Sequence, residues 1–271
     1  MSSIVCLITD LGSSDHYPGI LKGFLWSNYP ELRIVDLMHD IQEFNITAAA
    51  FITKISIEKF PEGSVFMVAV SVTGSQKLLV AKYKSRYIIV PDYGLITMIL
   101  DFPEEPIEVL SLSQMIYHPE NENPWQQIEN LAFAAGYIAM GGNWTQMGDP
   151  CSYEKKFFPL PHFNNQTLHC YIILIDHFGN VTVNLKKSEF PNHGPFTIYV
   201  RRHKIPKIHK FFSEITDGEC IAYWGNDGYL KIAIRSGSAS KLLGLKISDN
   251  ISIIFNSPPD DNTNRTNAVS S

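Results

Sequence analysis

The stretch Ile4–Gly12, Ile-Val-Cys-Leu-Ile-Thr-Asp-Leu-Gly, is an apolar run of strand length that stops at an aspartate and a glycine. A short apolar run followed by a loop and by residues with helical spacing is typical of the first buried strand of a parallel sheet. Ligands of such sheets bind beyond the carboxyl ends of the strands, and Asp10 lies at one of these ends. The Asp10 carboxylate can accept hydrogen bonds from two ribose hydroxyls, or it can cap the following helix; this residue alone favours neither interpretation.

Strands and helices alternate outward from this stretch, which predicts an α/β domain with a mostly parallel sheet and flanking helices. Gly19 and Gly23 are expected to let the first helix lie close to the sheet. The predicted helices are Ile20–Asn28, Phe44–Phe60 and Ile128–Met140, and the predicted strands are Ile34–Leu37, Ser64–Val70, Leu78–Tyr83, Arg86–Val90 and Ile107–Leu112.

The second part of the chain differs in kind. Between Gly141 and Phe163 the sequence becomes rich in Gly, Pro, Asn and aromatic residues, which indicates a domain boundary. Short apolar or alternating runs with almost no helix between them then predict a small antiparallel barrel or sandwich. The predicted strands are Thr167–Ile175, Asn180–Asn184, Thr197–Val200, Glu219–Tyr223, Tyr229–Ile234 and Ile251–Phe255. We therefore predict an α/β domain at residues 1–163, a barrel at 164–256 and a disordered tail at 257–271.

Composition excludes several classes of protein. Of the 271 residues, 45% are hydrophobic and 18% charged, as in globular proteins, and the net charge of -5 without a basic patch argues against a nucleic-acid partner. No signal peptide and no apolar run of about 18 residues is found, so we expect a cytoplasmic protein without a membrane partner. The four cysteines lack metal-ligand spacing, so we predict reduced thiols and no metal site: Cys6, Cys151, Cys170 and Cys220.

Two further segments are candidate sites. The loop Ser71–Gln76 follows a predicted buried strand at the same sheet edge as Asp10. Asp176–Asn180, Asp-His-Phe-Gly-Asn, places an acid, an aromatic ring and an amide on one turn, where a nucleoside can stack and bond, although a plain hairpin turn would have similar residues. His39 follows the second strand and can be a ligand or an acid–base group, although a single histidine at a strand end is more often structural. No standard catalytic motif is present.

Taken together, seven segments resemble one family, the S-adenosyl-L-methionine (SAM) hydroxide adenosyltransferases, whose superfamily includes the fluorinase and the chlorinase. The resemblance runs from about Ile4 to Phe255 in unchanged order. The segments that carry it are Ile8–Gly12, Asp15–Gly23, Ile34–Asp40, Phe44–Phe51, Pro91–Leu95, Asp176–Asn180 and Gly228–Ala239.

The resemblance implies an N-terminal α/β domain, a C-terminal barrel and a homotrimer whose adenosyl ligand lies between one subunit's N-domain and its neighbour's C-domain. It implies that Asp10 binds the ribose hydroxyls, that Asp176 and Asn180 bind the methionine and nucleoside parts, and that Phe178 forms the pocket wall. Arg235 and Ser236 would meet the adenine edge. The family more often has asparagine where Arg235 stands.

The family's reaction is displacement at the ribose C5′ carbon, which releases L-methionine and leaves adenosine. In the hydrolases an aspartate, an arginine and a histidine align the water. Here Ser71 stands near the aspartate's place, Lys77 is the nearest cation, and Gln126-Gln127 replaces the histidine. Serine and glutamine do not accept a proton from water near neutral pH, so the hydrolase mechanism does not carry over.

The segment Val72-Thr73-Gly74 looks more like the loop of the halogenating members. A halide needs desolvation and hydrogen-bond donors, which Thr73, Ser75 and Gln127 can supply. The candidate catalytic residues are Ser71, Thr73, Lys77, Gln126 and Gln127. We rank SAM hydrolysis by another arrangement first, an adenosyl-binding trimer without chemistry second and halogenation third; SAM is the substrate or ligand, and no separate cofactor is expected.

Overall fold

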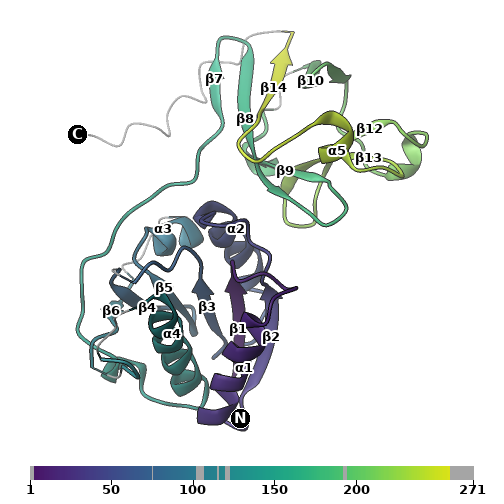
Figure 1. The fold of residues 1–271 in the computed structure, drawn as a ribbon. Helices are drawn as coiled ribbons and strands as arrows, with labels where there is room; N and C mark the ends of the chain where they lie inside the picture. The colour runs from purple at the N-terminus through teal and green to yellow at the C-terminus, as the bar shows by residue number, and fades with distance from the viewer. Residues whose placement is uncertain are drawn as a thin grey trace. The chain divides into compact units, whose positions relative to one another are not determined.

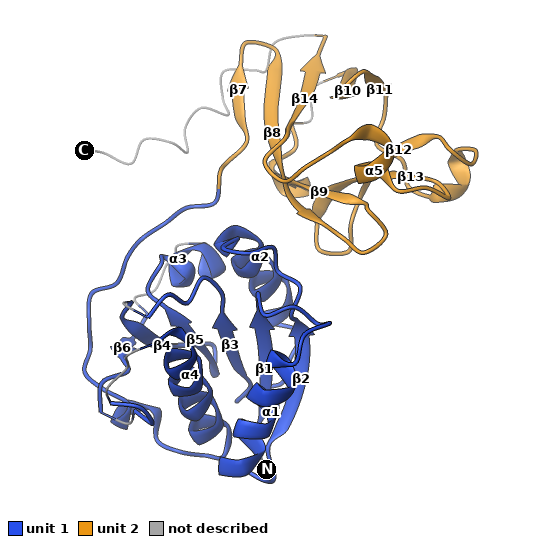
Figure 2. Cartoon of the chain, in the orientation of Figure 1, with its two compact units in different colours: residues 1–158 blue, residues 159–271 orange. Residues whose placement is uncertain are grey.

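The structure, a computed structural model, describes residues 3–74, 76–101, 107–114, 116–119, 123–191 and 194–256. The chain forms two compact units, residues 1–158 and 159–271 (Figure 2). The division falls at Phe158 and Pro159, inside the stretch in which the composition changes. Ser75 and the predicted tail 257–271 lie outside the described residues.

The first unit is built on a six-stranded sheet of order β2-β1-β3-β5-β4-β6. β1, β2, β3 and β5 run parallel, whereas β4 is antiparallel to both β5 and β6, so the sheet is mixed. This arrangement confirms the predicted α/β fold. The strands are β1 (Ile4–Thr9), β2 (Arg33–Met38), β3 (Val65–Ala69), β4 (Leu78–Tyr83), β5 (Arg86–Pro91) and β6 (Val109–Ser111).

Helices flank this sheet (Figure 1). α1 and α4 pack together, with α4 against β3 and β1, while α2 packs against α3 and β3. The helices are α1 (Tyr17–Asn28), α2 (Ile46–Ile57), α3 (Leu95–Leu100) and α4 (Pro124–Ala139), with a 3-10 turn at Trp144–Gln146.

Small residues set how closely the helices pack. A Cβ on Gly136 of α4 would lie 2.2 Å from the Tyr29 ring, so only glycine fits there, and the Tyr29 hydroxyl donates to the Phe133 carbonyl at 3.0 Å. The predicted close approach at Gly19 and Gly23 is wrong: both glycines of α1 are exposed and a Cβ would meet nothing within 4 Å. The close helix contact is therefore made by α4.

The second unit is a nearly closed antiparallel barrel of order β11-β10-β14-β8-β9-β13-β12, with β7 paired to β8. Its interior is apolar, with Val181, Ile198 and Ile232 fully buried, which confirms the predicted barrel class. The strands are β7 (His162–Asn164), β8 (Thr167–Ile175), β9 (Val181–Lys186), β10 (Phe196–Val200), β11 (His203–Ile205), β12 (Cys220–Trp224), β13 (Tyr229–Ile234) and β14 (Asn250–Phe255). The helical segments are α5 (Ala239–Leu243) and 3-10 turns at Lys187–Glu189 and Phe212–Glu214.

None of the helices in the described ranges combines the length and the hydropathy that a membrane span requires.

Candidate functional site

Asp10 lies at the carboxyl end of β1, where its half-buried carboxylate joins two loops. Its Oδ2 atom accepts hydrogen bonds from the main-chain N–H of Ser71 at 3.0 Å and of Phe44 at 3.4 Å. Its Oδ1 atom has no hydrogen bond to any described residue. One oxygen is therefore fixed by the protein, and the other remains to bind a donor such as a sugar hydroxyl.

The structure brings the predicted loop and the start of α4 together. Thr73 Oγ1 lies 3.2 Å from the Tyr93 hydroxyl and also accepts a hydrogen bond from Gln76 Nε2. Gln127, which is fully buried, donates from Nε2 to the Gln76 carbonyl at 3.4 Å. A Cβ on Gly74 would lie 3.6 Å from the nitrogen of Pro124 in α4. Thr73 and Gln127 thus belong to one packed region next to Ser71.

Gln127 leaves one polar atom unsatisfied. Its Oε1 atom is buried and has no hydrogen-bond partner among the described residues. The orientation of the amide follows from the Gln76 carbonyl, because only the NH₂ end of glutamine can donate to it. Gln127 therefore presents a hydrogen-bond acceptor, whereas the sequence suggested a donor for a halide.

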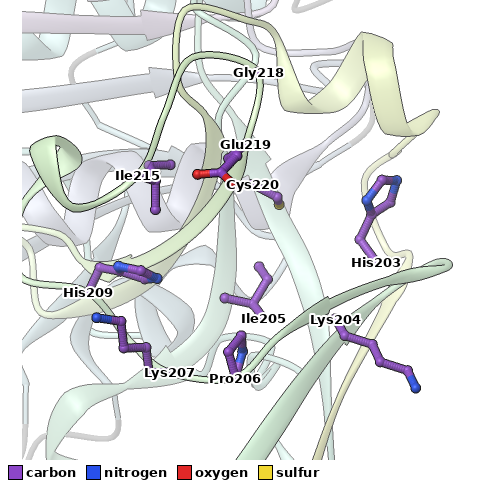
Figure 3. Close-up of a pocket in the computed structure, with 10 residues that line it drawn as sticks. All are labelled: His203, Lys204, Ile205, Pro206, Lys207, His209, Ile215, Gly218, Glu219 and Cys220. Carbon is purple, nitrogen blue, oxygen red and sulfur yellow. The ribbon is translucent and has the colours of Figure 1, made fainter.

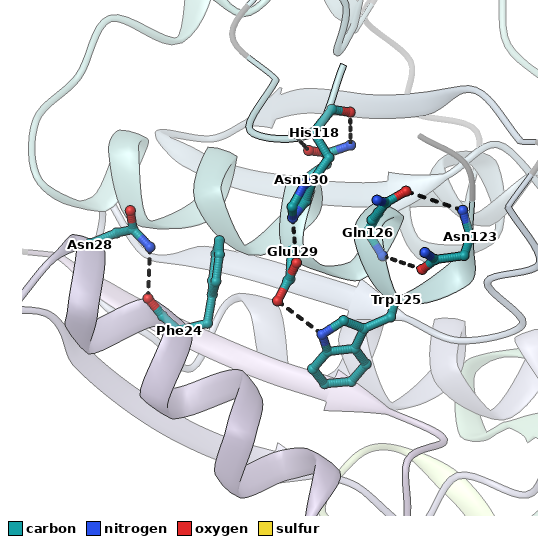
Figure 4. A network of polar contacts seen from close by, with 8 residues as sticks. All are labelled: Phe24, Asn28, His118, Asn123, Trp125, Gln126, Glu129 and Asn130. Carbon is teal, nitrogen blue, oxygen red and sulfur yellow. Dashed lines mark hydrogen bonds and ion pairs between the residues drawn. The ribbon is translucent and has the colours of Figure 1, made fainter. Parts of the chain in front are cut away.

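Gln126 and Lys77 make protein contacts of their own. Gln126 and Asn123 form a capping box at the start of α4: the Gln126 N–H donates to Asn123 Oδ1 at 3.0 Å and the Asn123 N–H donates to Gln126 Oε1 at 3.3 Å (Figure 4). The Lys77 ammonium donates to the Ser152 carbonyl at 3.0 Å.

A polar network on α4 was missed by the sequence analysis. Trp125 Nε1 donates to Glu129 Oε1 at 2.9 Å, and the other Glu129 oxygen contacts His118 Nε2 (Figure 4). Asn130 holds the main chain of His118 at both its N–H, 2.7 Å, and its carbonyl, 3.2 Å. The spacing of Trp125 and Glu129, one helical turn, was the available signal. The network fixes the residue 118 region to the helix that carries Gln126 and Gln127.

In the second unit, Asp176 and Asn180 close one turn. The main-chain N–H of Asn180 donates to Asp176 Oδ1 at 2.8 Å, and Asn180 Nδ2 donates to Asp176 Oδ2 at 3.0 Å. Phe178 at the tip is 74% exposed. Gly179 has φ of 81° and its carbonyl accepts the Ser240 N–H at 2.8 Å, so the turn packs against the segment that follows β13.

Arg235 and Ser236 lie in that segment and order a neighbouring loop. Arg235 Nη1 donates to the Ile215 and Phe212 carbonyls, and its Nε lies 2.9 Å from Asp217 Oδ1. Ser236 Oγ donates to the same Asp217 oxygen at 3.0 Å. The predicted contact of these residues with an adenine edge stays a prediction.

Hydrogen bonding and burial shift the pKa of groups near both segments. Hydrogen bonds from the Ser13 side chain and then its main chain lower the pKa of Asp40, which follows β2 at the Asp10 edge. Burial, followed by the charges of Asp176 and Asp227, raises the pKa of Tyr223. Asp40 therefore stays ionised and Tyr223 neutral at physiological pH.

A separate cavity of about 460 Å³ opens in the second unit beside the end strands β11 and β12 (Figure 3). Residues from His203 to Lys207 and from Gly218 to Cys220 line it, and none of the predicted site residues does. Burial raises the pKa of the Cys220 thiol to about 11, so this cysteine is a neutral thiol at physiological pH. Within the ranges that the structure covers, no group of three or more His, Cys, Asp or Glu is placed to hold a metal ion.

The chain is a two-unit protein, an α/β unit followed by an antiparallel barrel, and both units match models of one family. Residues 5–148 match the family model described as SAM hydroxide adenosyltransferase N-terminal domain, and residues 170–252 match the C-terminal domain. The chain belongs to the SAM hydroxide adenosyltransferase family.

Individual relatives have two different activities in their names. The chain is 28% identical to an (R)-S-adenosyl-L-methionine hydrolase of Methanocaldococcus jannaschii, over 93% of this chain and 96% of that one. It is 24% identical to a fluorinase of Nocardia brasiliensis, over 92% and 96%. A solved structure of an uncharacterized conserved protein from Thermotoga maritima matches with a TM-score of 0.78 and 26% identity, over 92% and 99%. The names support a SAM-processing activity in this family.

Proposed function

We propose that this protein binds SAM and hydrolyses it to adenosine and L-methionine. The observation that carries the proposal is the Asp10 carboxylate, which has one oxygen held by Ser71 and Phe44 and the other without a described partner. A fixed carboxylate at the carboxyl edge of a parallel sheet suits the hydroxyls of a ribose. The (R) sulfonium epimer is the form to test first, because the hydrolases of Methanocaldococcus jannaschii and Thermus thermophilus are named for it.

The reaction requires little acid–base chemistry from the protein. The oxygen of water bonds to C5′ while the C5′–S bond breaks, and the electron pair of that bond stays on sulfur as the neutral thioether of methionine. The proton of the attacking water passes to solvent. Because the sulfonium is already a good leaving group, the protein's task is to align the water and remove its solvation shell. Ser71, Thr73 and Lys77 are the candidates for this task beside Asp10.

Gln127 supports water over halide as the nucleophile. A water molecule can donate a hydrogen bond to the unpartnered Oε1 atom, whereas a halide can only accept. A buried oxygen without a donor costs about 1–3 kcal/mol, so a water that enters next to it is stabilised. This observation supports the proposal of hydrolysis rather than halogenation.

In the proposed site, the second unit of another copy of the chain supplies the remaining ligand contacts. Asp176, Phe178 and Asn180 would hold the methionine and nucleoside parts of a ligand bound by another copy of the chain, with Arg235 and Ser236 near the adenine. Association into a homotrimer is therefore part of the proposal, and SAM is the substrate rather than a cofactor.

Product analysis tests the proposed activity. Purified protein is incubated with each SAM epimer, with and without chloride or fluoride, and products are separated by chromatography. We expect adenosine and methionine in equal amounts, and at least about a tenfold lower rate for Asp10→Ala, because its loss removes hydrogen bonds to a charged group. If no adenosine forms above a protein-free control, hydrolysis is rejected. Formation of a 5′-halogenated nucleoside would show that the reaction is halogenation instead.

A second candidate is an adenosyl-binding protein without turnover. The capping box favours it, because Gln126 stands where the hydrolases have histidine and its side chain bonds to the helix start. Calorimetry that detects binding of SAM to a protein that forms no product would support this candidate. Absence of binding would exclude both.

A further inference from the structure

Four polar side chains form a row of contacts that ends next to the Asp10 loop, which we define as residues Asp10–Gly12. Lys22 Nζ donates to Asp36 Oδ2 at 2.8 Å, His39 Nε2 lies 3.1 Å from Asp36 Oδ1, and His39 Nδ1 lies 2.8 Å from Thr9 Oγ1. Thr9 is fully buried and His39 is 6% exposed. Thr9 is the last residue of β1 and directly precedes Asp10. The row therefore connects α1 and β2 to the residue on which the proposed site depends.

The chemistry of the four side chains indicates which of them donate and which accept hydrogen bonds. Lysine only donates, so Asp36 accepts; burial acts to raise the Asp36 pKa, but the Lys22 ammonium and the His39 ring that face the carboxylate together lower it. His39 Nε2 faces the carboxylate without the alignment of a full hydrogen bond, but it must carry the proton, because a lone pair at 3.1 Å would repel the oxygen. In the tautomer that carries its proton on Nε2, the Nδ1 atom of His39 is an acceptor and the Thr9 hydroxyl donates to it.

The remaining lone pairs of Thr9 bind the loop itself. Thr9 Oγ1 accepts the main-chain N–H of Leu11 at 3.3 Å, and the Gly12 N–H donates to the His39 carbonyl at 2.8 Å. The β1–β2 ladder shifts register between Leu7 and Ile8, so the regular pairing of the strands does not continue up to the loop. Thr9, through its side chain, and His39, through its main-chain carbonyl, thus hold the main chain of Leu11 and Gly12.

We propose that Thr9 and His39 are positioning residues for the ligand: together they hold the Asp10 loop so that the free carboxylate oxygen faces the sugar hydroxyls. This inference rests on the proposed function of the Asp10 edge. Neither residue needs to touch the ligand, because each acts through the main chain of Leu11 and Gly12.

Calorimetric titration with adenosine tests the inference. Thr9→Val removes the hydroxyl with little change of shape, whereas Thr9→Ser keeps it. The matched control is Thr53→Val in α2, where a buried hydroxyl donates to the Ala49 carbonyl at 2.8 Å. We expect Thr9→Val to raise the Kd about five- to tenfold, as the loss of one or two buried hydrogen bonds predicts, while Thr9→Ser restores binding and Thr53→Val leaves it unchanged.

A second pair of variants covers the case in which Thr9→Val does not fold. His39→Asn keeps an acceptor at the same number of bonds from Cα as Nδ1, and His39→Leu does not. We expect adenosine binding to be kept by His39→Asn and weakened by His39→Leu.

Wild-type affinity in the folded Thr9→Val or His39→Leu protein would overturn the inference. Asp10→Ala separates this result from failure of the proposed function: if Asp10→Ala also binds normally, the sugar does not bind at this edge. If only Asp10→Ala weakens binding, the edge is the site and Thr9 and His39 do not position it.

Discussion

The two N–H groups that bind Asp10 come from residues in the left-handed backbone region, Ser71 with φ of 60° and Phe44 with φ of 61°. This conformation costs a non-glycine residue roughly 1–2 kcal/mol, and a hydrogen bond to a carboxylate offsets it. Because the carboxyl ends of parallel strands meet at one edge, the sequence predicts that Asp10 and the 71–76 loop are neighbours. The donors were not predictable, because neither Ser71 nor Phe44 is of a residue type that signals positive φ.

Asp36 makes the stability of the first unit depend on pH. Burial acts to raise its folded pKa, but the contacts with Lys22 and His39 together outweigh burial and hold this pKa below the ordinary value of 3.8. A lowered pKa contributes stability that is present above the unfolded value and is lost as the pH falls through the folded value.

We therefore expect the free energy of unfolding to decrease from about pH 5 towards pH 3, and Asp36→Asn to flatten this decrease. Denaturant titrations at each pH measure the free energy of unfolding of the wild type and of Asp36→Asn. An unchanged slope in the variant would show that other carboxylates cause the acid sensitivity.

At the level of elements, long periodic segments were predictable and short ones were not. The predicted strands Leu78–Tyr83 and Thr167–Ile175 agree with β4 and β8 at both ends. β7 and β11 have three residues each, too few for a hydrophobic period, and were missed. α4 begins at Pro124 rather than at the predicted Ile128, because Asn123 and Gln126 cap it in a way that apolar spacing does not reveal.

The turn after β8 gives a test at this scale. Gly179 has φ of 81°, and a Cβ there would lie 1.9 Å from Ser238 Oγ. Gly218 has nearly the same φ, 83°, but nothing within 4 Å of a Cβ. We expect Gly179→Ala to destabilise the protein by about 1–3 kcal/mol more than Gly218→Ala, because only the first variant adds a steric overlap to the backbone cost.

Thermal or denaturant unfolding of the two variants measures this difference. Equal losses would mean that the turn moves away from Ser238 without penalty.

For the whole molecule, the alternation of the first 140 residues and the strand-rich remainder were enough to predict the class of each unit, since each pattern has few compact solutions. The proposed ligand contacts, by contrast, come from both units: Asp10 from residues 1–158 and Asp176 from residues 159–271. No local sequence pattern indicates whether one copy of the chain or two copies supply these ligand contacts. The family resemblance, which implies a homotrimer, is the basis of that part of the proposal.

The assembly is tested by light scattering during size-exclusion chromatography. A homotrimer has three times the chain mass of 30.6 kDa. We expect this mass at the concentrations used for activity. A monomer that is fully active would contradict a site shared between copies.

The central claim is that the free oxygen of Asp10 binds the ribose hydroxyls. A double-mutant cycle tests it, in which the Kd of adenosine and of 2′,3′-dideoxyadenosine is measured by calorimetry for the wild type and for Asp10→Ala. We predict that the wild type prefers adenosine by about tenfold or more, as hydrogen bonds to a charged group imply, and that Asp10→Ala binds both nucleosides equally. The same preference in both proteins would contradict the claim.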